Sequence, residues 1–354
     1  MASSGPLVGA SSPNRDIALR QLLRPLMPFL KDDKVPELAM NRPGEVWTRG
    51  EGGWRRHELP ELTSEYLESL SRALAVYNGL PLGSLMSVAL PGGERGQVVR
   101  RPACVLGFAP IAIRKHRPVS HGLEELAERG AFSSVQDVSF HQPSRDEARG
   151  LLQERGPRGL LRFEAELLAM KREGDLLGFC RAAVRSKRNI VVSGKTFSGK
   201  TTLARALVAE VPAHERIVTI EDVHELELPN PNRVALLFGQ GEGRESAEAC
   251  LAASMRLSPD RIFLGELRGS EAWEYVMGLN TGHPGSVTTT HANSAVETFE
   301  RLASLVTNSE VGPSLERAEV RREFYRTIDV VLFMASWKVV EMFYDPIFKR
   351  EQVM

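Results

Sequence analysis

Residues 189–211, NIVVSGKTFSGKTTLARALVAEV, decide the fold. The apolar run 190–192 predicts a buried strand, and the segment from Thr201 onward predicts a helix. Between them, residues 194–201 match the pattern G-x-x-x-x-G-K-[ST], in which backbone N–H groups and a helix N-terminus face phosphate oxygens. Lys200 then lies between the β- and γ-phosphates, and the Thr201 hydroxyl binds Mg²⁺. We therefore expect a nucleotide site made by Gly194, Lys195, Thr196, Phe197, Ser198, Gly199, Lys200, Thr201 and Thr202.

A second segment places acidic side chains after a predicted strand. RIVTIEDVHELEL (216–228) ends in Glu221, Asp222, Glu225 and Glu227. Ligands of α/β proteins gather where the strands end, so a carboxylate here could orient water or a metal ion. A solvated acidic turn explains the same residues equally well, and the sequence alone leaves both interpretations open.

Two further strand ends carry a carboxylate and histidines. RIFLGELRG (261–269) predicts a buried strand that ends in Glu266. We expect Glu266 to hold Mg²⁺, directly or through water, or to polarise the attacking water. A purely structural role in the core is disfavoured, because burying an unpaired carboxylate costs free energy. In TGHPGSVTTTHANS (281–294), His291 could sense the γ-phosphate, whereas a structural role is equally open for it and for His283. No cysteine or third ligand lies nearby in the sequence, which argues against zinc.

Composition narrows the class of protein. The chain has 354 residues, 42% of them hydrophobic and 25% charged, which predicts a globular protein of two domains. The net charge is zero, so direct binding of nucleic acid is expected to be weak or absent. Three cysteines without a close pair indicate a reduced, cytoplasmic protein. Neither a signal peptide nor an apolar run of about 18 residues is present, so any membrane association should be peripheral.

The sequence predicts two domains joined by a connector. Leucines at helical spacing in 17–30 predict a helix that packs on the first domain, with a membrane-surface helix as the alternative. Thr63 or Ser64 should begin a second helix that stops at Asn78. Later, apolar strands alternate with helices, which predicts an α/β domain with a parallel sheet covered on both faces. The expected boundaries are a disordered lead (1–16), an N-terminal α+β domain (17–117), a linker with short helices (118–160) and an ATPase domain (161–354).

The sequence resembles the secretion ATPase superfamily, most closely the traffic ATPases of type IV secretion and conjugation systems. Four blocks carry the resemblance in order: GKTFSGKTT, TIEDVHEL, SMRLSPDRIFLGELRGSEAW and NTGHPGSVTTTHANSAVETFERL. It implies a PAS-like N-terminal domain, a RecA-like P-loop domain, ATP and Mg²⁺ as cofactors, and a homohexameric ring. The ring would lie at the cytoplasmic face of the inner membrane, with other secretion-system components as partners, and would power substrate transfer or pilus biogenesis.

The resemblance also assigns roles to single residues. Glu225 is similar to the family's acidic-box catalytic glutamate, Glu266 to its second-strand glutamate and His291 to its His-box histidine. Arg95 in GGER and Arg114 in IAIRK resemble N-terminal arginines that reach the γ-phosphate, a task that suits the guanidinium fork. As an alternative, both could be exposed strand arginines.

Two departures from the family pattern keep other functions open. Lys195 and Phe197 stand where the loop usually has small residues, and Phe197 is strained if its φ is positive. A nucleotide-binding scaffold with little turnover is therefore one alternative. A pilus-assembly or type II secretion ATPase is another, although type II members usually carry a four-cysteine insertion that this sequence lacks. A DNA translocase fits the zero net charge poorly.

Overall fold

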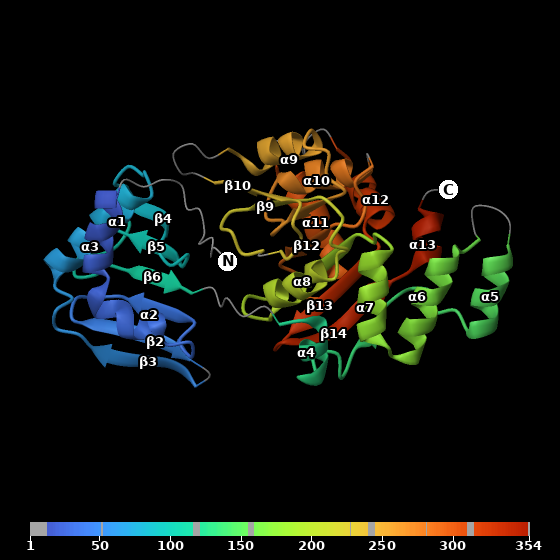
Figure 1. Cartoon of the computed structure of the whole chain (residues 1–354), viewed down its shortest axis with the longest axis horizontal. Coiled ribbons are helices and arrows are strands. Elements are labelled where there is room, and N and C mark those ends of the chain that lie inside the picture. Colours follow the sequence, from blue (N-terminus) through green and yellow to red (C-terminus); the bar gives the residue numbers. More distant parts are fainter. Residues whose placement is uncertain are drawn as a thin grey trace. The chain divides into compact units, whose positions relative to one another are not determined.

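The computed structural model describes residues 13–50, 52–115, 121–154, 159–226, 228–239, 245–280, 282–309 and 315–352, and it divides into two units (Figure 1). The first unit holds the described residues up to 115, and the second holds those from 121 onward. Of the expected disordered lead (1–16), residues 1–12 lie outside the described residues, whereas residues 13–16 belong to the first helix. Of the expected linker (118–160), residues 118–120 and 155–158 lie outside them. Within the described ranges, no helix is both long and apolar enough to cross a membrane.

The first unit is a six-stranded antiparallel sheet covered on one face by helices. The strands follow the order β3-β2-β1-β6-β5-β4. In β6, Ile111 and Ile113 are buried, while Ala112 and Arg114 point to the open face. The elements are α1 (Pro13–Leu22), η1 (Arg24–Leu26), α2 (Met27–Lys31), β1 (Glu37–Met40), β2 (Glu45–Gly50), β3 (Gly53–Glu58), α3 (Ser64–Tyr77), β4 (Leu85–Ala89), β5 (Arg95–Val99) and β6 (Ile111–Arg114).

Local sequence signals explain the helices of this unit. The hydroxyl of Thr63 accepts the backbone N–H of Tyr66 at 3.2 Å, so α3 begins with the predicted side-chain cap. At the N-terminus, Pro25 and Pro28 divide the expected helix into α1, η1 and α2. Leu19 and Leu26 are fully buried in the core of this unit, which favours the packed helix over a membrane-surface helix.

The second unit is an α/β domain built on a mainly parallel sheet. Two ladders, β10-β9-β11 and β12-β8-β13-β14-β7, are joined where Leu267 bridges Thr290. Among the described strands of this sheet, only β14 runs antiparallel to its neighbour β13, an exception to the predicted parallel pattern. The strands are β7 (Gln136–Asp137), β8 (Ile190–Gly194), β9 (Ile217–Glu221), β10 (Arg233–Leu237), β11 (Arg261–Leu264), β12 (Val287–Thr290), β13 (Val330–Ala335) and β14 (Lys338–Tyr344).

Helices cover both faces of this sheet, as predicted (Figure 1). Side chains of β8 alternate between two cores, with Ile190 and Val192 in one and Val191 in the other. Gly174, at φ +76°, separates α6 from α7. The helices are α4 (Leu123–Glu128), α5 (Arg145–Gln153), α6 (Arg162–Glu173), α7 (Leu176–Arg185), α8 (Lys200–Ala209), α9 (Ala247–Met255), α10 (Glu271–Asn280), α11 (Glu297–Thr307), α12 (Arg317–Thr327) and α13 (Pro346–Glu351).

The segment expected as a linker contributes α4, β7 and α5 to this second unit. β7 pairs in parallel with β14. The buried ammonium of Lys171, on α6, lies 2.8 Å from the carboxylate of Asp137 and donates to the Tyr344 carbonyl at 2.9 Å. Its third contact is the Ser139 hydroxyl, at 3.0 Å. These bonds hold the end of β7 against α6 and β14.

A buried ion pair lies at the edge of the sheet where the parallel strands begin, opposite the edge that carries the phosphate loop. It fixes the ends of several elements. The guanidinium of Arg261, which is fully buried, donates to both carboxylate oxygens of Glu215 at 2.7 and 2.9 Å. It also donates to the carbonyls of Val184, at the end of α7, and of Gly285, before β12. One side chain therefore connects four segments that lie far apart in the sequence.

Candidate active site

The phosphate loop links β8 to α8 through three positive φ angles. Gly194 has φ +148°, and a Cβ there would lie 2.4 Å from the Met334 carbonyl oxygen. Gly199 has φ +97°, and a Cβ there would lie 3.0 Å from the indole of Trp337. Both positions therefore require glycine. Phe197 has φ +63°, so the predicted backbone strain at this residue is confirmed.

Lys200 opens α8 and folds back over the loop. Its buried ammonium donates to the carbonyls of Gly194 at 2.9 Å and Lys195 at 2.8 Å. Beside it, the hydroxyl of Ser198 is buried and has no hydrogen-bond partner among the described residues. A buried hydroxyl without a partner is costly, and a phosphate oxygen is an acceptor that would satisfy it. Thr201 and Thr202, which follow, are half-buried in the first turn of α8.

A continuous row of polar side chains leads from Lys200 to the neighbouring strand ends. The ammonium of Lys200 lies 3.5 Å from Nδ1 of His291, whose Nε2 is 3.0 Å from one carboxylate oxygen of Glu266. The other oxygen accepts the guanidinium of Arg268 at 2.6 Å, and Arg268 also donates to Asp222 at 3.0 Å. The structure thus brings the predicted Lys200, His291 and Glu266 together.

The electrostatic surroundings favour the neutral form of His291. Burial lowers the pKa of His291 below its ordinary value of 6.5, and the positive charge of Lys200 lowers it further, against the opposing effect of Glu266. A neutral ring can accept a hydrogen bond at Nδ1 from Lys200, while its Nε2 lies 3.0 Å from the Glu266 carboxylate. His291 therefore connects a cation and a carboxylate without adding a charge.

The acidic residues from the end of β9 onward differ in burial, since Glu221 is buried and Asp222 and Glu225 are half-buried. Glu221 is buried, and its carboxylate accepts the backbone N–H groups of Glu225 at 2.9 Å and Leu226 at 2.8 Å. It therefore shapes the turn, which favours the structural interpretation for this residue. Glu225 lies 3.8 Å from Arg205 of α8, next to the phosphate loop. Glu227 lies outside the described residues.

Arg95 and Arg114 are direct neighbours in the sheet of the first unit. They pair across β5 and β6, and Glu37 of β1 pairs with Arg114 on its other side. Because paired residues on adjacent strands point to the same face, both guanidinium groups project from the open face of that sheet. The two residues belong to the first unit and the other candidate residues to the second, so their role at a phosphate stays a prediction.

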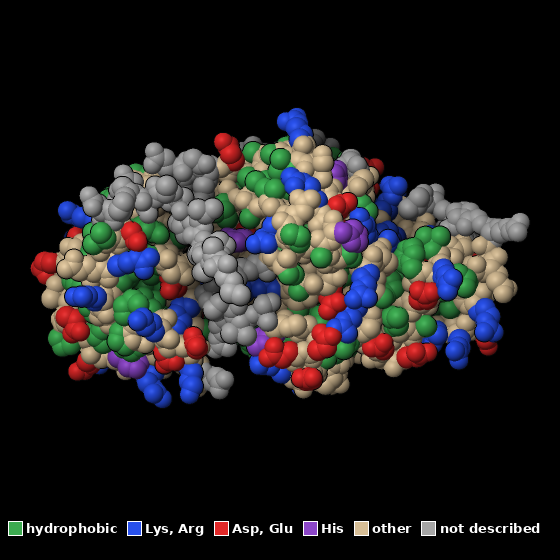
Figure 2. Space-filling model, viewed as in Figure 1, with side chains coloured by type: hydrophobic (Ala, Val, Ile, Leu, Met, Phe, Trp, Pro, Cys, Tyr) green, Lys and Arg blue, Asp and Glu red, His purple; other side chains and the backbone are tan. Residues whose placement is uncertain are grey.

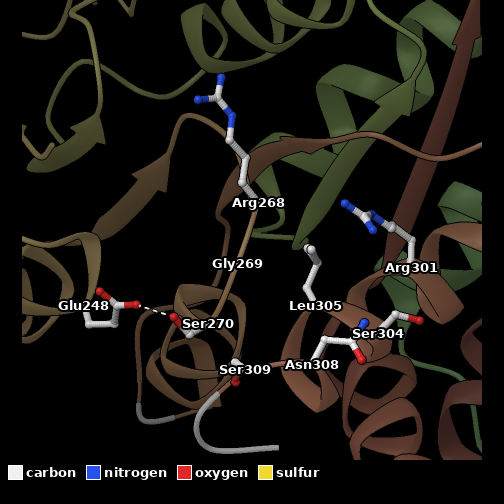
Figure 3. Close-up of a pocket in the computed structure, with 9 residues that line it drawn as sticks. All are labelled: Glu248, Arg268, Gly269, Ser270, Arg301, Ser304, Leu305, Asn308 and Ser309. Carbon is white, nitrogen blue, oxygen red and sulfur yellow. Dashed lines mark hydrogen bonds between the residues drawn. The ribbon is translucent and has the colours of Figure 1, made fainter. Parts of the chain in front are cut away.

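Arg268 also lines a cavity of about 560 Å³ (Figure 3). Figure 3 shows Ser304, Leu305 and Asn308 at the end of α11, facing the loop that carries Gly269. The hydroxyl of Ser270 donates to Glu248 across this cavity at 2.6 Å. None of the described residues that line it belongs to the phosphate loop, and Arg268 is the residue that it shares with the candidate site.

Sequence reasoning missed three residues at the site. Arg268 stands two positions after Glu266. A basic residue so close to a candidate catalytic carboxylate could have been predicted to pair with it. Arg205 lies on α8, which follows the loop, and is recognisable only by its contact with Glu225. Trp337 contacts the loop from a distant hairpin and leaves no signal in the sequence.

Comparisons with known proteins identify the family of the chain. The family model described as "Type II/IV secretion system protein" matches residues 159–332. The chain is 38% identical to the type IV secretion system protein VirB11 of Bartonella quintana over 341 residues, which is 94% of each chain. It is 36% identical to VirB11 of Rhizobium radiobacter over 334 residues, or 92% of each chain.

Solved structures give the same result. The VirB11 ATPase of the Brucella suis type IV secretion system, solved with sulphate, matches with a TM-score of 0.52 and 37% identity over 96% of this chain and 98% of that one. The pilus retraction motor PilT shares the fold, with a TM-score of 0.54 and 20% identity over 88% of this chain and 77% of that one. With close relatives matched over nearly their whole length, the chain belongs to the VirB11 family of type IV secretion system ATPases.

Proposed function

We propose that this ATPase hydrolyses a Mg²⁺-bound ATP at the carboxyl ends of β8, β11 and β12, as a ring-forming motor of a type IV secretion machine. One observation carries the proposal: Lys200, His291 and Glu266 form a connected row beside the phosphate loop. The Brucella suis relative, which is 37% identical to the chain, was solved in complex with sulphate, a tetrahedral oxyanion like phosphate.

Each residue of the row has a chemical task that suits its position. The loop amides and the Lys200 ammonium surround the β- and γ-phosphates and neutralise the charge that develops between them. Glu266 lies at the end of β11, where it can orient the attacking water, and Glu225 is the alternative for that task. Neutral His291 lies between Glu266 and Lys200 of the phosphate loop, so it fixes the position of the carboxylate relative to the loop.

The side chains present also suit Mg²⁺. This ion usually takes one or two protein oxygens and completes its shell with phosphate oxygens and water. The Thr201 hydroxyl and the Glu266 carboxylate would supply such oxygens. Among the described residues there is no group of three or more His, Cys, Asp or Glu side chains that could enclose a metal ion by itself. When bound, Mg²⁺ would supply positive charge that neutralises the phosphates.

The wider assembly is part of the same proposal. Six copies would form a ring attached peripherally to the inner membrane, and the neighbouring Arg95 and Arg114 would stabilise the γ-phosphate. Other secretion-system components would bind the ring. Among the described residues on the face shown in Figure 2, basic and acidic side chains are interspersed over both units, which supports weak or absent binding of nucleic acid.

Turnover and binding of purified variants test the proposal. We expect Lys200→Ala to abolish the heat of binding of Mg-ATP, because it removes the cation at the phosphates. Glu266→Gln should keep binding and lose about 100-fold or more in turnover. The exposed Lys34→Ala and Glu274→Gln serve as matched controls with wild-type behaviour. A wild-type chain that binds ATP without turnover would instead be a nucleotide-binding scaffold.

A further inference from the structure

The turn between β13 and β14 holds an exposed tryptophan in an unfavourable backbone conformation. Ala335 pairs with Lys338, so the turn has two residues, Ser336 at φ +49° and Trp337 at φ +65°. Two positive φ angles define a type I′ turn, which favours Asn and Gly. Trp337 nevertheless occupies the position where glycine is preferred, and its side chain is 53% exposed. A bulky residue in such a position suggests a function for its side chain.

This tryptophan lies directly against the phosphate loop. Its backbone N–H donates to the carbonyl of Ser198 at 3.0 Å. A Cβ on Gly199 would lie 3.0 Å from the indole carbon Cε3, so the ring covers the glycine that precedes Lys200. The hairpin and α8 lie side by side in the same unit (Figure 1). The indole is therefore fixed against the phosphate loop.

Strand order gives the direction in which a bound nucleotide runs. β8 carries the loop and lies between β12 and β13. His291 follows β12, and Glu266 follows β11 beyond it, so the terminal phosphate must point to this side in order to react. The nucleoside must then extend to the other side, where the β13–β14 turn presents Trp337.

We propose that Trp337 is the platform on which the purine base of the bound nucleotide stacks. The inference rests on the proposed ATPase site and names a residue that holds its substrate. A flat indole face suits an aromatic base, and one such stack commonly contributes about tenfold or more to affinity. Stacking recognises the base and not the phosphates, so this residue should distinguish a nucleotide from a bare phosphate chain.

Calorimetric titrations with two ligands test the platform. ADP carries a base, whereas tripolyphosphate carries none. We expect Trp337→Gly to weaken ADP binding about tenfold and to change tripolyphosphate binding less than twofold. Glycine suits the positive φ of this position, so the variant keeps the turn. Trp337→Phe should retain most of the affinity for ADP, because phenylalanine can also stack.

Fluorescence supplies an independent measurement. A stacked base should quench the emission of Trp337, so ADP should lower the fluorescence of the wild-type protein but not that of Trp337→Phe. Trp54→Phe, which changes an exposed tryptophan of the first unit, is the control and should keep the quenching. Equal losses for ADP and tripolyphosphate in Trp337→Gly would show that the residue only supports the loop, and unchanged ADP affinity would also overturn the platform. A wild-type chain that binds neither ligand would refute the proposed ATPase site as well.

Discussion

Replacing Arg261 by methionine should destabilise the second unit by about 3–5 kcal/mol, because it leaves a buried carboxylate without its main partner. Arg261 is fully buried, and both oxygens of Glu215 accept its guanidinium within 2.9 Å. After the change, Glu215 keeps the weaker contact with Lys187, at 3.5 Å. The carbonyl of Gly285 also loses a donor. A loss of this size is a large share of the stability of an ordinary domain.

Urea unfolding followed by circular dichroism measures this loss, and two comparisons test its cause. The double variant Arg261→Met/Glu215→Met should be more stable than Arg261→Met alone, since it removes the unpaired carboxylate. The hydrogen bond from Arg261 lowers the pKa of Glu215. The stability that this pair contributes should therefore be present at neutral pH and be lost as the pH falls below the ordinary carboxyl value of 4.5. A double variant no more stable than the single one would refute the reasoning, as would a difference between wild type and Arg261→Met that persists undiminished well below pH 4.5.

Three other changes have expected outcomes. Protonation of His291 would place its positive charge beside that of Lys200, so kcat/KM for ATP should fall as the pH drops below 6.5. His291→Gln should flatten this acidic limb of the pH profile. An unchanged limb in the variant would assign it to another group. Burial lowers the pKa of Lys171, and Lys171→Met should cost about 3 kcal/mol in urea unfolding, with Asp137→Asn/Lys171→Met milder than the single change. Phe197→Gly should change the free energy of unfolding by no more than about 1 kcal/mol, because relief of strain is offset by the entropy of glycine; a loss above about 2 kcal/mol in thermal unfolding would show that phenylalanine packing dominates.

Local signals predicted the strand and the helix that form the phosphate site, and also the start of one helix of the first unit. The strand before Gly194, the helix after Lys200 and the cap at Thr63 all follow from patterns within a few residues, and the structure confirms them. The positive φ of Phe197 was also accessible, because the position in the loop requires it regardless of the side chain. Periodicity and loop chemistry act over such short distances that the rest of the fold does not alter them.

Contacts between distant segments could not be predicted in the same way. The four acidic residues that begin at the end of β9 look alike in sequence, but among those that the structure describes only Glu221 is buried and accepts two backbone N–H groups. Arg261 begins an apolar strand, and nothing near it indicates that Glu215 lies opposite. In each case the task of a charged side chain is set by which strand lies next to its own, and this is a property of the assembled sheet.

Strand order also divides the residues of the site into two groups with different effects on catalysis. In the proposed arrangement, residues that follow β11 and β12 would face the end of the nucleotide that reacts, whereas the turn after β13 would face the end that is only bound, because β8 lies between β12 and β13. An interaction present equally in the ground and transition states changes KM, and one that forms with the developing charge changes kcat. Glu266→Gln should therefore lower kcat with little effect on KM, and Trp337→Gly should raise KM with little effect on kcat. Placing both residues on the same side of β8 would remove this division, because the base and the γ-phosphate cannot occupy one side of the loop together.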